Sequence, residues 1–337
     1  MATATGHVIT NGTKQAPDAE GLSLLIIVLH YRGLEDTLEC IASLGQQTYQ
    51  NFHTIVVDNG SGETPKVQLA AAHPWVEILE MGENRGWSGG NNEGIRLAIA
   101  GNYDWVCLLN NDTVLPENTV ARLMESAALL GPSVLHPAID SYGDDNEIQF
   151  DPTIPEPPGM TATAVRERAG LYQVSAVNGS CLLAHVDVFR KIGLIDERFF
   201  LLCEDADLGA RAVAAGFHAF CDTGVRIQHK ESRSFGGRRK PIKTYYGLRN
   251  MLLFREKHER LQRTYFEYGR DLAWMVWGTA EAAGVAPRSW WDLLCWGFSK
   301  DLFARAVRMG LRDYLLRRFG RINNRDEQVL VARIEAR

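Results

Sequence analysis

Continuous apolar runs alternate with helix-like patterns along the first part of the chain. The runs of strand length are residues 22–29, 52–57, 76–79 and 103–109. After the first run, apolar residues recur at the spacing of one helical face, namely Leu34, Leu38, Ile41 and Leu44. Strands that alternate with helices predict an α/β fold with a mostly parallel central sheet flanked by helices.

The pattern changes beyond residue 140. Residues 140–170 are acidic and proline-rich without clear periodicity, which predicts a loop excursion. Regular structure is then predicted for residues 172–184, 186–192, 204–215 and 225–228, and the chain beyond Lys243 is mostly helical. The predicted organisation is therefore a flexible tail at 1–20, an α/β domain at 21–243 and a helical C-terminal extension at 244–337.

Polar residues follow several of the predicted strands directly. Asp58 follows the second strand, residues 83–91 form a segment rich in glycine and asparagine, and Asn110-Asn111-Asp112 follow the fourth. Right-handed crossovers would bring these strand ends to one edge of the sheet, where ligands of open α/β folds bind. Carboxylate and amide oxygens there suit a hard divalent cation with phosphate, whereas an Asx turn is the simpler interpretation of each site.

Composition excludes a globally disordered chain and favours a reducing compartment. The protein has 337 residues, 45% of them hydrophobic, which is enough for a full core. The six cysteines show no C-x-x-C pairing and several lie in apolar runs, which suits reduced thiols in the cytoplasm. The tail lacks an apolar signal segment, and the most apolar C-terminal region, 272–298, is interrupted by charges.

The C-terminal part is basic and rich in tryptophan. Residues 231–337 hold 22 Lys and Arg against 12 Asp and Glu. Its aromatic residues include Trp274, Trp277, Trp290, Trp291 and Trp296. Aromatic side chains beside cations are typical of peripheral contact with a membrane surface, although tryptophans in such a pattern more often make core or oligomer contacts.

Several residues have the chemistry needed to displace a nucleoside diphosphate from a sugar. Asp112 is a candidate ligand for Mg²⁺ or Mn²⁺ bridging the phosphates, and His229, at the end of the 225–228 strand, is a candidate second ligand. Asp58 is a candidate acceptor for the imide N–H of uracil or thymine. A structural histidine and a turn-stabilising aspartate are the alternatives.

A general base is also predicted. Glu204 and Asp205 are adjacent carboxylates that follow the apolar residues 199–202, where repulsion and burial raise a carboxyl pKa. One of them would orient the acceptor hydroxyl and the other would take its proton. Carboxylates in a first helical turn are also ordinary partners of the helix dipole.

These motifs together resemble the inverting family 2 glycosyltransferases of the GT-A fold, especially their rhamnosyltransferase-like and galactofuranosyltransferase-like branch. The matching segments are V-V-D-N-G-S at 56–61, N-R-G-W-S-G-G-N-N at 84–92, L-L-N-N-D-T at 108–113, V-N-G-S-C-L-L at 177–183, F-F-L-L-C-E-D-A-D-L at 199–208, and His229 followed by Y-Y-G-L-R-N at 245–250.

The resemblance implies a role for each matching position. It implies nucleobase recognition at Asp58, metal binding at Asp112 and His229, and a catalytic base at Asp205 beside Glu204. Further donor contacts are implied at Asn84, Arg85, Gly86, Gly89, Gly90, Asn110, Asn111, Asn178 and Gly179. The family's acidic metal tripeptide usually begins with Asp, whereas this chain has Asn110, so a weaker Mg²⁺ or Mn²⁺ site is expected.

The favoured hypothesis is a metal-dependent inverting transfer of a sugar from a dTDP- or UDP-sugar, above all dTDP-L-rhamnose, to a glycan or polyprenyl-diphosphate-linked acceptor in cell-surface polysaccharide assembly. Acceptor or diphosphate contacts are predicted at Trp87, Arg238, Arg239 and Lys240. The alternatives are a UDP-galactofuranose-type transferase and a non-catalytic nucleotide- or glycan-binding module. A dinucleotide-dependent oxidoreductase is disfavoured because no G-x-G-x-x-G follows the first strand.

The expected location is the cytoplasm or the inner face of the cytoplasmic membrane. Nucleic acid is not an expected partner, and a homo-oligomer is compatible with the tryptophan pattern.

Overall fold

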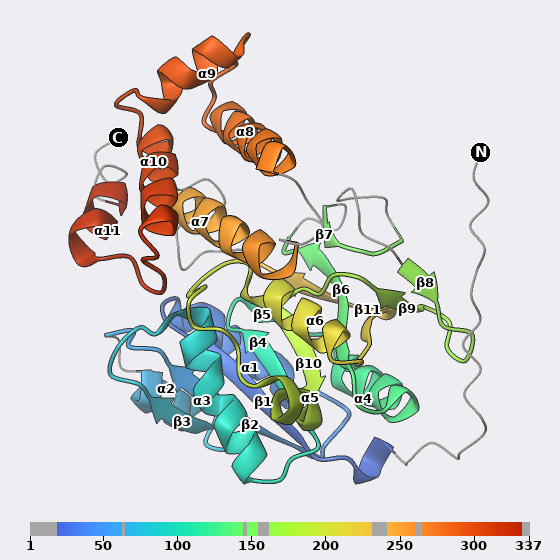
Figure 1. Cartoon of the computed structure of the whole chain (residues 1–337). Helices are drawn as coiled ribbons and strands as arrows, with labels where there is room; N and C mark the ends of the chain where they lie inside the picture. The colour runs from blue at the N-terminus through green and yellow to red at the C-terminus, as the bar shows by residue number, and fades with distance from the viewer. Residues whose placement is uncertain are drawn as a thin grey trace. The chain divides into compact units, whose positions relative to one another are not determined.

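A computed structural model describes residues 19–62, 65–143, 147–153, 162–230, 241–259 and 265–331 (Figure 1). The chain divides into two compact units. Unit 1 comprises Met1–Ile195 and Leu208–Arg233, and unit 2 comprises Asp196–Asp207 and Ser234–Arg337. One helix, α6 (Glu204–Ala214), runs from unit 2 into unit 1.

Within the described residues of unit 1, eleven strands form a single mixed sheet. The strands are β1 (Leu24–His30), β2 (Phe52–Asp58), β3 (Glu77–Glu80), β4 (Trp105–Asn110), β5 (Thr113–Val114), β6 (Val134–Ser141), β7 (Ile148–Phe150), β8 (Ala162–Ala164), β9 (Leu171–Val174), β10 (Cys181–His185) and β11 (Ala219–His229). Their order is β3-β2-β1-β4-β10-β6-β11-β9-β8, with β5 on β11 and β7 on β6.

The four strands β3, β2, β1 and β4 are parallel, as the alternating pattern predicts. Their register aligns His30 with Asp58, and Leu29 with Asn110, so β1 separates these two polar strand ends. The mostly parallel α/β sheet expected from the sequence is confirmed. The strand β10 runs antiparallel to β4 and aligns Cys181 with Leu109.

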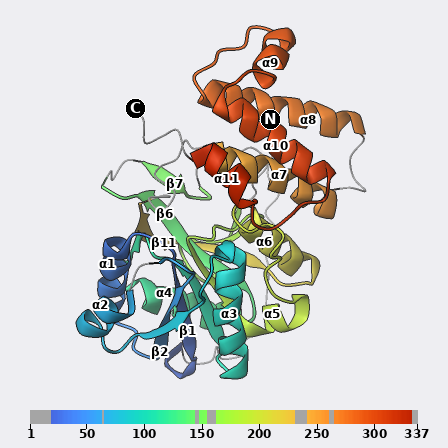
Figure 2. The ribbon, with the colours of Figure 1, turned by 90° about the vertical axis from the view of Figure 1, so that its left-hand side faces the viewer.

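Helices cover both faces of the sheet (Figure 2). In unit 1 these are α1 (Leu34–Gly45), α2 (Pro65–Ala72), α3 (Gly86–Ala100), α4 (Thr119–Leu130) and α5 (Val186–Ile192). All seven residues of β1 are buried, and they alternate in direction. Ile26 and Val28 lie in the core cluster with residues of α1 and α4, whereas Ile27 lies against α3 at Gly94. A strand covered on both faces explains the continuous apolar run in the sequence.

Regular structure extends further than the sequence pattern indicates. The helix α3 begins at Gly86, so most of the glycine- and asparagine-rich segment forms its first turns. The strands β7 and β8 lie within residues 140–170, where a loop excursion was expected, and β7 pairs with β6. These strands are short, and three or four residues carry too little periodicity to be recognised.

The regular structure in the described part of unit 2 is entirely helical. Its helices are α7 (Pro241–His258), α8 (Tyr265–Ala282), α9 (Trp290–Gly297), α10 (Leu302–Leu315) and α11 (Asn324–Val331). One cluster of buried residues joins Phe200 to Tyr245 and Tyr246 of α7 and Met309 of α10. The mostly helical C-terminal region agrees with the sequence pattern.

Candidate active site

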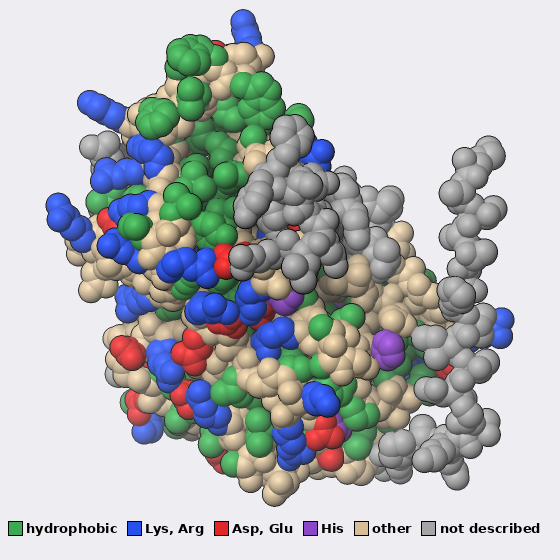
Figure 3. Space-filling view, viewed as in Figure 1, with side chains coloured by type: hydrophobic (Ala, Val, Ile, Leu, Met, Phe, Trp, Pro, Cys, Tyr) green, Lys and Arg blue, Asp and Glu red, His purple; other side chains and the backbone are tan. Residues whose placement is uncertain are grey.

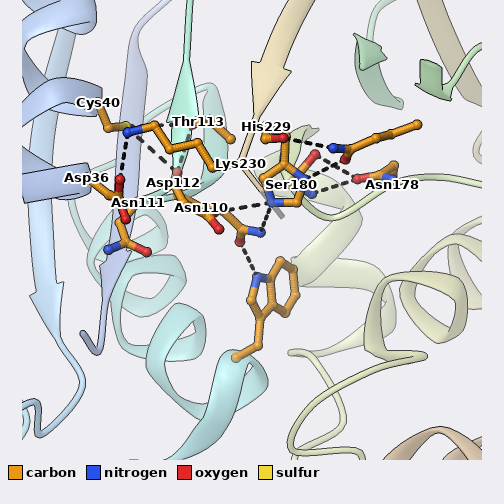
Figure 4. A network of polar contacts seen from close by, with 12 residues as sticks. Asp36, Cys40, Asn110, Asn111, Asp112, Thr113, Asn178, Ser180, His229 and Lys230 are labelled. Carbon is orange, nitrogen blue, oxygen red and sulfur yellow. Dashed lines mark hydrogen bonds and ion pairs between the residues drawn. The ribbon is translucent and has the colours of Figure 1, made fainter. Parts of the chain in front are cut away.

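Asp112 and His229 lie side by side at one edge of the unit 1 sheet (Figure 4). Asp112 follows β4, and His229 ends β11, which pairs with β5 at Thr113. The Asp112 Oδ1 and His229 Nε2 atoms are 3.2 Å apart, and both side chains are largely buried. The backbone N–H of Lys230 donates to the Asp112 carbonyl at 2.9 Å, which fastens the two segments together. The predicted neighbours thus meet, although 117 positions separate them in sequence.

The orientation of the His229 ring is set by Gln149 on β7. The Gln149 Oε1 atom lies 2.8 Å from His229 Nδ1, and the Gln149 amide also donates to the His229 carbonyl at 2.8 Å. An amide oxygen can only accept, so Nδ1 carries hydrogen in this contact. In the tautomer that carries its single ring hydrogen on Nδ1, His229 directs the lone pair of Nε2 toward Asp112.

Asn110 is held in one orientation by Trp87. The indole N–H of Trp87 donates to Asn110 Oδ1 at 2.9 Å, so the Asn110 amide directs its NH₂ group toward His229 Nε2, 3.4 Å away. Trp87 lies in the first turn of α3 and is mostly buried. The Trp87 indole N–H is therefore used in a hydrogen bond within the protein. Contact between Trp87 and an acceptor stays a prediction.

The turn at Asn178 adjoins the same edge. The Asn178 side chain accepts hydrogen bonds from the backbone N–H and hydroxyl of Ser180 at 2.9 and 2.8 Å. The carbonyl of Ser180 accepts the backbone N–H of Asn110 at 2.9 Å. Asn178 and Gly179 are therefore brought to the end of β4, where donor contacts were predicted.

The start of α3 is tied to the end of β2 by Asn59. Its Oδ1 accepts the backbone N–H of Arg85 at 2.9 Å, and its amide donates to the Gly86 carbonyl at 2.9 Å and to Asn84 Oδ1 at 3.2 Å. Asp58 is buried, and its Oδ1 accepts the backbone N–H of Ser61 at 2.9 Å, as in an Asx turn. The segments at Asp58, 83–91 and Asn110 thus lie together. The hydrogen bond expected of a turn-stabilising Asp58 is also present.

The glycines of α3 differ in their surroundings. Gly86 has a φ of 74°, a left-handed conformation that favours glycine. A Cβ atom on Gly90 would lie 2.4 Å from Leu29 Cδ1 and 3.2 Å from Asn59 Cγ. Gly90 therefore lets α3 approach β1 closely, and this packing role is the simpler of the two interpretations of the glycine segment.

Lys230 and Asn111 connect the candidate site to α1 and the loop that precedes it. The Lys230 ammonium lies 2.6 Å from Asp36 Oδ1 and also bonds to Glu39. Burial opposes its charge, but these two carboxylates outweigh that effect and raise the Lys230 pKa. The Asn111 amide donates to the Arg32 carbonyl and to Thr37 Oγ1 at 3.0 and 2.8 Å, so its NH₂ group is used inside the protein.

The donor set fits a divalent cation in part. No group of three or more His, Cys, Asp or Glu side chains suited to metal binding occurs within the described ranges. The carboxylate of Asp112 and the lone pair of His229 Nε2 nevertheless face one another, and two acceptors at 3.2 Å require a cation or a proton between them. A cation that draws its remaining ligands from phosphate and water, as Mg²⁺ usually does, matches this arrangement.

In unit 2, Glu204 and Asp205 open α6 after a strained turn. Phe200, Leu202 and Cys203 have positive φ angles of 63°, 70° and 70°, which side chains other than glycine adopt rarely. Glu204 is buried, its Oε2 makes no hydrogen bond within the described part of the chain, and burial together with the Asp205 charge raises its pKa well above the ordinary value. Glu204 is thus harder to ionise than an exposed carboxyl group.

Comparison with known proteins decides the family. The model of glycosyl transferase family 2 matches residues 25–193, half of the chain and the greater part of unit 1. The chain belongs to glycosyl transferase family 2. The family resemblance read from the motifs is confirmed, and so is the assignment of the protein as a glycosyltransferase.

Relatives of this family 2 glycosyltransferase lie in the expected branch. The chain is 27% identical over 221 residues to the N-acetylglucosaminyl-diphospho-decaprenol L-rhamnosyltransferase of Mycobacterium tuberculosis, covering 58% of this chain and 72% of the relative. It is 26% identical over 206 residues to the galactofuranosyltransferase GlfT1 of the same species, covering 58% and 66%.

The structural comparison confirms the GT-A type of fold. The mannosyltransferase PcManGT of Pyrobaculum calidifontis, solved with GDP-Man and Mn²⁺, superposes with a TM-score of 0.53 over 89% of each chain. The two sequences are 13% identical, so this likeness concerns the fold alone.

Sequence reasoning missed residues of the candidate site that contact it from distant parts of the chain. Gln149, Asn59 and Lys230 each bond to a predicted site residue or to its neighbours. Asn59 and Lys230 stand next to predicted residues, which is a signal that could have found them. Gln149 had none, because it lies in the aperiodic segment. The predicted residues Arg238, Arg239 and Lys240 fall outside the described residues.

Proposed function

We propose that this glycosyltransferase moves a sugar, with inversion, from a dTDP- or UDP-sugar to a hydroxyl of a glycan or lipid-linked acceptor in cell-surface polysaccharide assembly. The observation that carries the proposal is the pairing of Asp112 and His229 at 3.2 Å, at a sheet edge that also bears Asn110 and Asn178. Similarity to a rhamnosyltransferase favours dTDP-L-rhamnose as the donor.

Asp112 and His229 would hold Mg²⁺ or Mn²⁺ against the donor diphosphate. The bound cation neutralises negative charge on the leaving group. The Asn110 NH₂ group, which Trp87 directs toward His229, would use a hydrogen to donate to a phosphate or sugar oxygen. Asn178 and Gly179 would supply further contacts at the end of β4, and residues 84–90 would place the first turn of α3 near the donor.

Asp58 would recognise the nucleobase. Its Oδ1 accepts the Ser61 backbone N–H, which leaves Oδ2 to accept the imide N–H of thymine or uracil. This bond requires a ring N–H on the base, which adenine lacks on its pairing edge, so adenine donors are expected to bind poorly.

Asp205 would act as the general base. The acceptor hydroxyl oxygen forms the new bond to the anomeric carbon, the bond from that carbon to the diphosphate oxygen breaks with its electron pair, and the hydroxyl proton passes to Asp205. Burial and the neighbouring Asp205 charge raise the Glu204 pKa, so Asp205 is the member of the pair proposed to take the proton. Attack opposite to the leaving group inverts the anomeric configuration.

We also propose that α8 and α9 rest on the membrane that carries the acceptor. Trp290, Trp291 and Phe298 are 53%, 69% and 76% exposed, and hydrophobic side chains gather over these helices in Figure 3. Trp296, by contrast, lies in a buried cluster, so the tryptophans divide between core and surface. None of the helices in the described part of the chain is long and apolar enough to cross a bilayer. Exposed indole rings beside arginines suit an anionic membrane surface.

A donor screen tests the proposal. Purified protein with Mn²⁺ or Mg²⁺ would be incubated with dTDP-rhamnose, UDP-galactofuranose, other UDP-sugars and GDP-mannose, with and without polyprenyl-diphosphate sugars, while nucleoside diphosphate release is followed. Turnover with dTDP-rhamnose that requires the acceptor and yields an inverted anomeric centre by NMR supports the proposal. Preference for UDP-galactofuranose would change the donor. Binding without turnover for every donor would make the protein a binding module.

The variant Asp205→Asn distinguishes a role in proton transfer from a role in donor binding. Because it removes a base and no donor ligand, turnover should fall by about 1000-fold, while nucleotide affinity stays within about twofold of wild type. Asp187→Asn, at an exposed carboxylate on α5, is the control. Retained turnover would remove the base assignment, and parallel loss of nucleotide affinity would make Asp205 structural.

A further inference from the structure

The turn that precedes the candidate base has an unusual backbone. Three of its residues, Phe200, Leu202 and Cys203, hold positive φ angles without being glycine. Such strain persists only where the surroundings fix it, and it concentrates at functional sites. Glu204 and Asp205 follow immediately as the first turn of α6. The conformation of this turn therefore determines where α6 starts and thus where the Glu204 and Asp205 side chains lie.

Asn250 of α7 fixes this turn through three main-chain carbonyls. Its side-chain nitrogen lies 2.6, 2.7 and 2.9 Å from the carbonyl oxygens of Phe199, Leu201 and Leu202, so its two hydrogens are shared among three acceptors. These carbonyls face a single amide group within the turn that holds the left-handed conformations described above. Asn250 is fully buried.

Arg249 determines which way the Asn250 amide points. The Arg249 Nε–H donates to Asn250 Oδ1 at 3.0 Å, so the NH₂ end must face the turn. Its Nη1 donates to the Gly320 carbonyl at 2.8 Å, and its Nη2 donates to the Phe199 carbonyl at 3.3 Å. The guanidinium also lies over the Tyr245 and Tyr246 rings, 5.2 and 5.0 Å from their centroids. The Arg249 guanidinium is fully buried, and its hydrogen bonds orient the Asn250 amide and main-chain carbonyls.

We propose that Asn250 and Arg249 are positioning residues for the proton transfer, and that they act by fixing the peptide planes of residues 199–202 so that the Asp205 carboxylate keeps one orientation. The proposal rests on the proposed function of Asp205. All of these contacts lie within unit 2, whereas Asp58, Asp112 and His229 belong to unit 1. Loss of the contacts is therefore expected to reduce kcat without affecting donor binding.

The decisive variants are Asn250→Asp and Asn250→Ala. Asn250→Asp keeps the shape but replaces the donating NH₂ with an oxygen that faces three carbonyl oxygens, so it should be at least as impaired as Asn250→Ala. We expect kcat to fall by about 30-fold or more, with the donor KM and the Kd for the nucleoside diphosphate with Mn²⁺ within about twofold of wild type. The matched control in the same unit is Asn323→Ala. Asn323 precedes α11, and its side-chain oxygen accepts the backbone N–H of Asp326.

A double variant tests whether Asn250 acts through Asp205. In an Asp205→Asn background, Asn250→Ala should change the residual turnover by less than about threefold, because residues that act as a unit are not additive. A full additional loss would overturn the proposal. So would a kcat within about threefold of wild type in folded Asn250→Ala, or a joint loss of kcat, nucleotide affinity and Tm.

A second variant tests the proposal if Asn250→Ala does not fold, and a second measurement tests it if the wild type shows no turnover. Arg249→Lys keeps a cation but loses the Nε–H that orients Asn250, and it should show the same loss of kcat at constant KM. Hydrogen exchange of amides 199–205 should increase in Asn250→Ala relative to Asn323→Ala, and unchanged exchange would overturn the proposal. If the wild type turns over no donor, the proposed function fails while the exchange result still judges the role of Asn250 in holding the turn.

Discussion

Gln149 holds His229 at two points, accepting from its ring at Nδ1 and donating to its backbone carbonyl, each at 2.8 Å. Both contacts come from a three-residue strand in a segment where a loop was expected. Partners of this kind fix the tautomer and the orientation of a metal-binding histidine and are a large part of such a site. The affinity of the site for a cation should therefore depend on Gln149.

Replacing Gln149 with leucine should weaken cation binding by about tenfold or more, because His229 would lose the acceptor that holds its Nε2 lone pair toward Asp112. Mn²⁺ binding in the presence of the nucleoside diphosphate, followed by electron paramagnetic resonance, measures this. Gln173→Leu is a matched control, since Gln173 makes a similar amide contact with the exposed His218 at 3.2 Å. Equal Mn²⁺ affinity in both variants would contradict the role of Gln149.

Removal of the divalent cation should stop turnover. EDTA is expected to abolish it, and Mn²⁺ or Mg²⁺ to restore it. Asp112→Asn should lower kcat/KM by about 100-fold, equivalent to ~3 kcal/mol of transition-state stabilisation. Steady-state rates across a Mn²⁺ titration check this. Turnover that survives EDTA and the Asp112 substitution would show that the pair with His229 has another purpose.

Asn110→Asp should tighten the cation site. The carboxylate adds a negative charge beside Asp112 and His229, while the Trp87 indole still has an oxygen to bond to. Mn²⁺ affinity should rise by about threefold to tenfold, because affinity at oxygen sites follows the number of charged ligands. Calorimetric titration of wild type and variant with Mn²⁺ provides the measurement. A weaker site in the variant would indicate that the Asn110 NH₂ group itself contributes to binding.

Buried His136 should make the fold sensitive to mild acid. Burial lowers its pKa from 6.5 to about 4, and hydrogen bonds to the Pro137 and Ala176 backbone only partly offset this. The unfolded chain thus binds a proton at a higher pH than the folded one, so stability is intact above pH 6.5 and falls as the pH drops toward 4. The loss from this group at pH 5 is about 2 kcal/mol.

Urea unfolding of wild type and His136→Asn at pH 7.5 and pH 5.0 measures this effect. The variant is expected to be less stable at pH 7.5 because packing against Phe150 is lost, but to show a smaller decrease between the two pH values. His218→Gln controls for removal of a solvent-exposed histidine. An equal decrease in wild type and His136→Asn would exclude His136 as the source.

Strong local patterns explain what could be predicted from the sequence. The parallel strands β1, β2 and β4 are buried on both faces and so appear as unbroken apolar runs, and the polar residues that end them had to share one edge. This reasoning placed Asp58, Asn110 and Asp112 together. His229 was a candidate because it ends a predicted strand and matches the family motif, and the pairing of β11 with β5 at Thr113 brings it to Asp112.

The remaining features depend on contacts between distant residues, which leave no period in the sequence. Gln149 reaches His229 across 80 positions, and Asn250 reaches Phe199 across 51. The segment Y-Y-G-L-R-N was recognised as a family motif, but its pattern gave no reason for the Arg249–Asn250 pair, because that reason lies in carbonyl groups of another segment. A buried polar pair with no local partner is the signal that prompts a search for such groups.

The antiparallel direction of β10 has a consequence for how sugar choice can change. Because β10 enters the sheet at Cys181 opposite Leu109, the turn at Asn178 reaches the ligand edge without a helical crossover of its own. This turn can vary in length or sequence while every β–α–β connection stays intact. If the turn contacts the donor as proposed, exchange of a few residues there would alter donor preference and leave the strands unchanged.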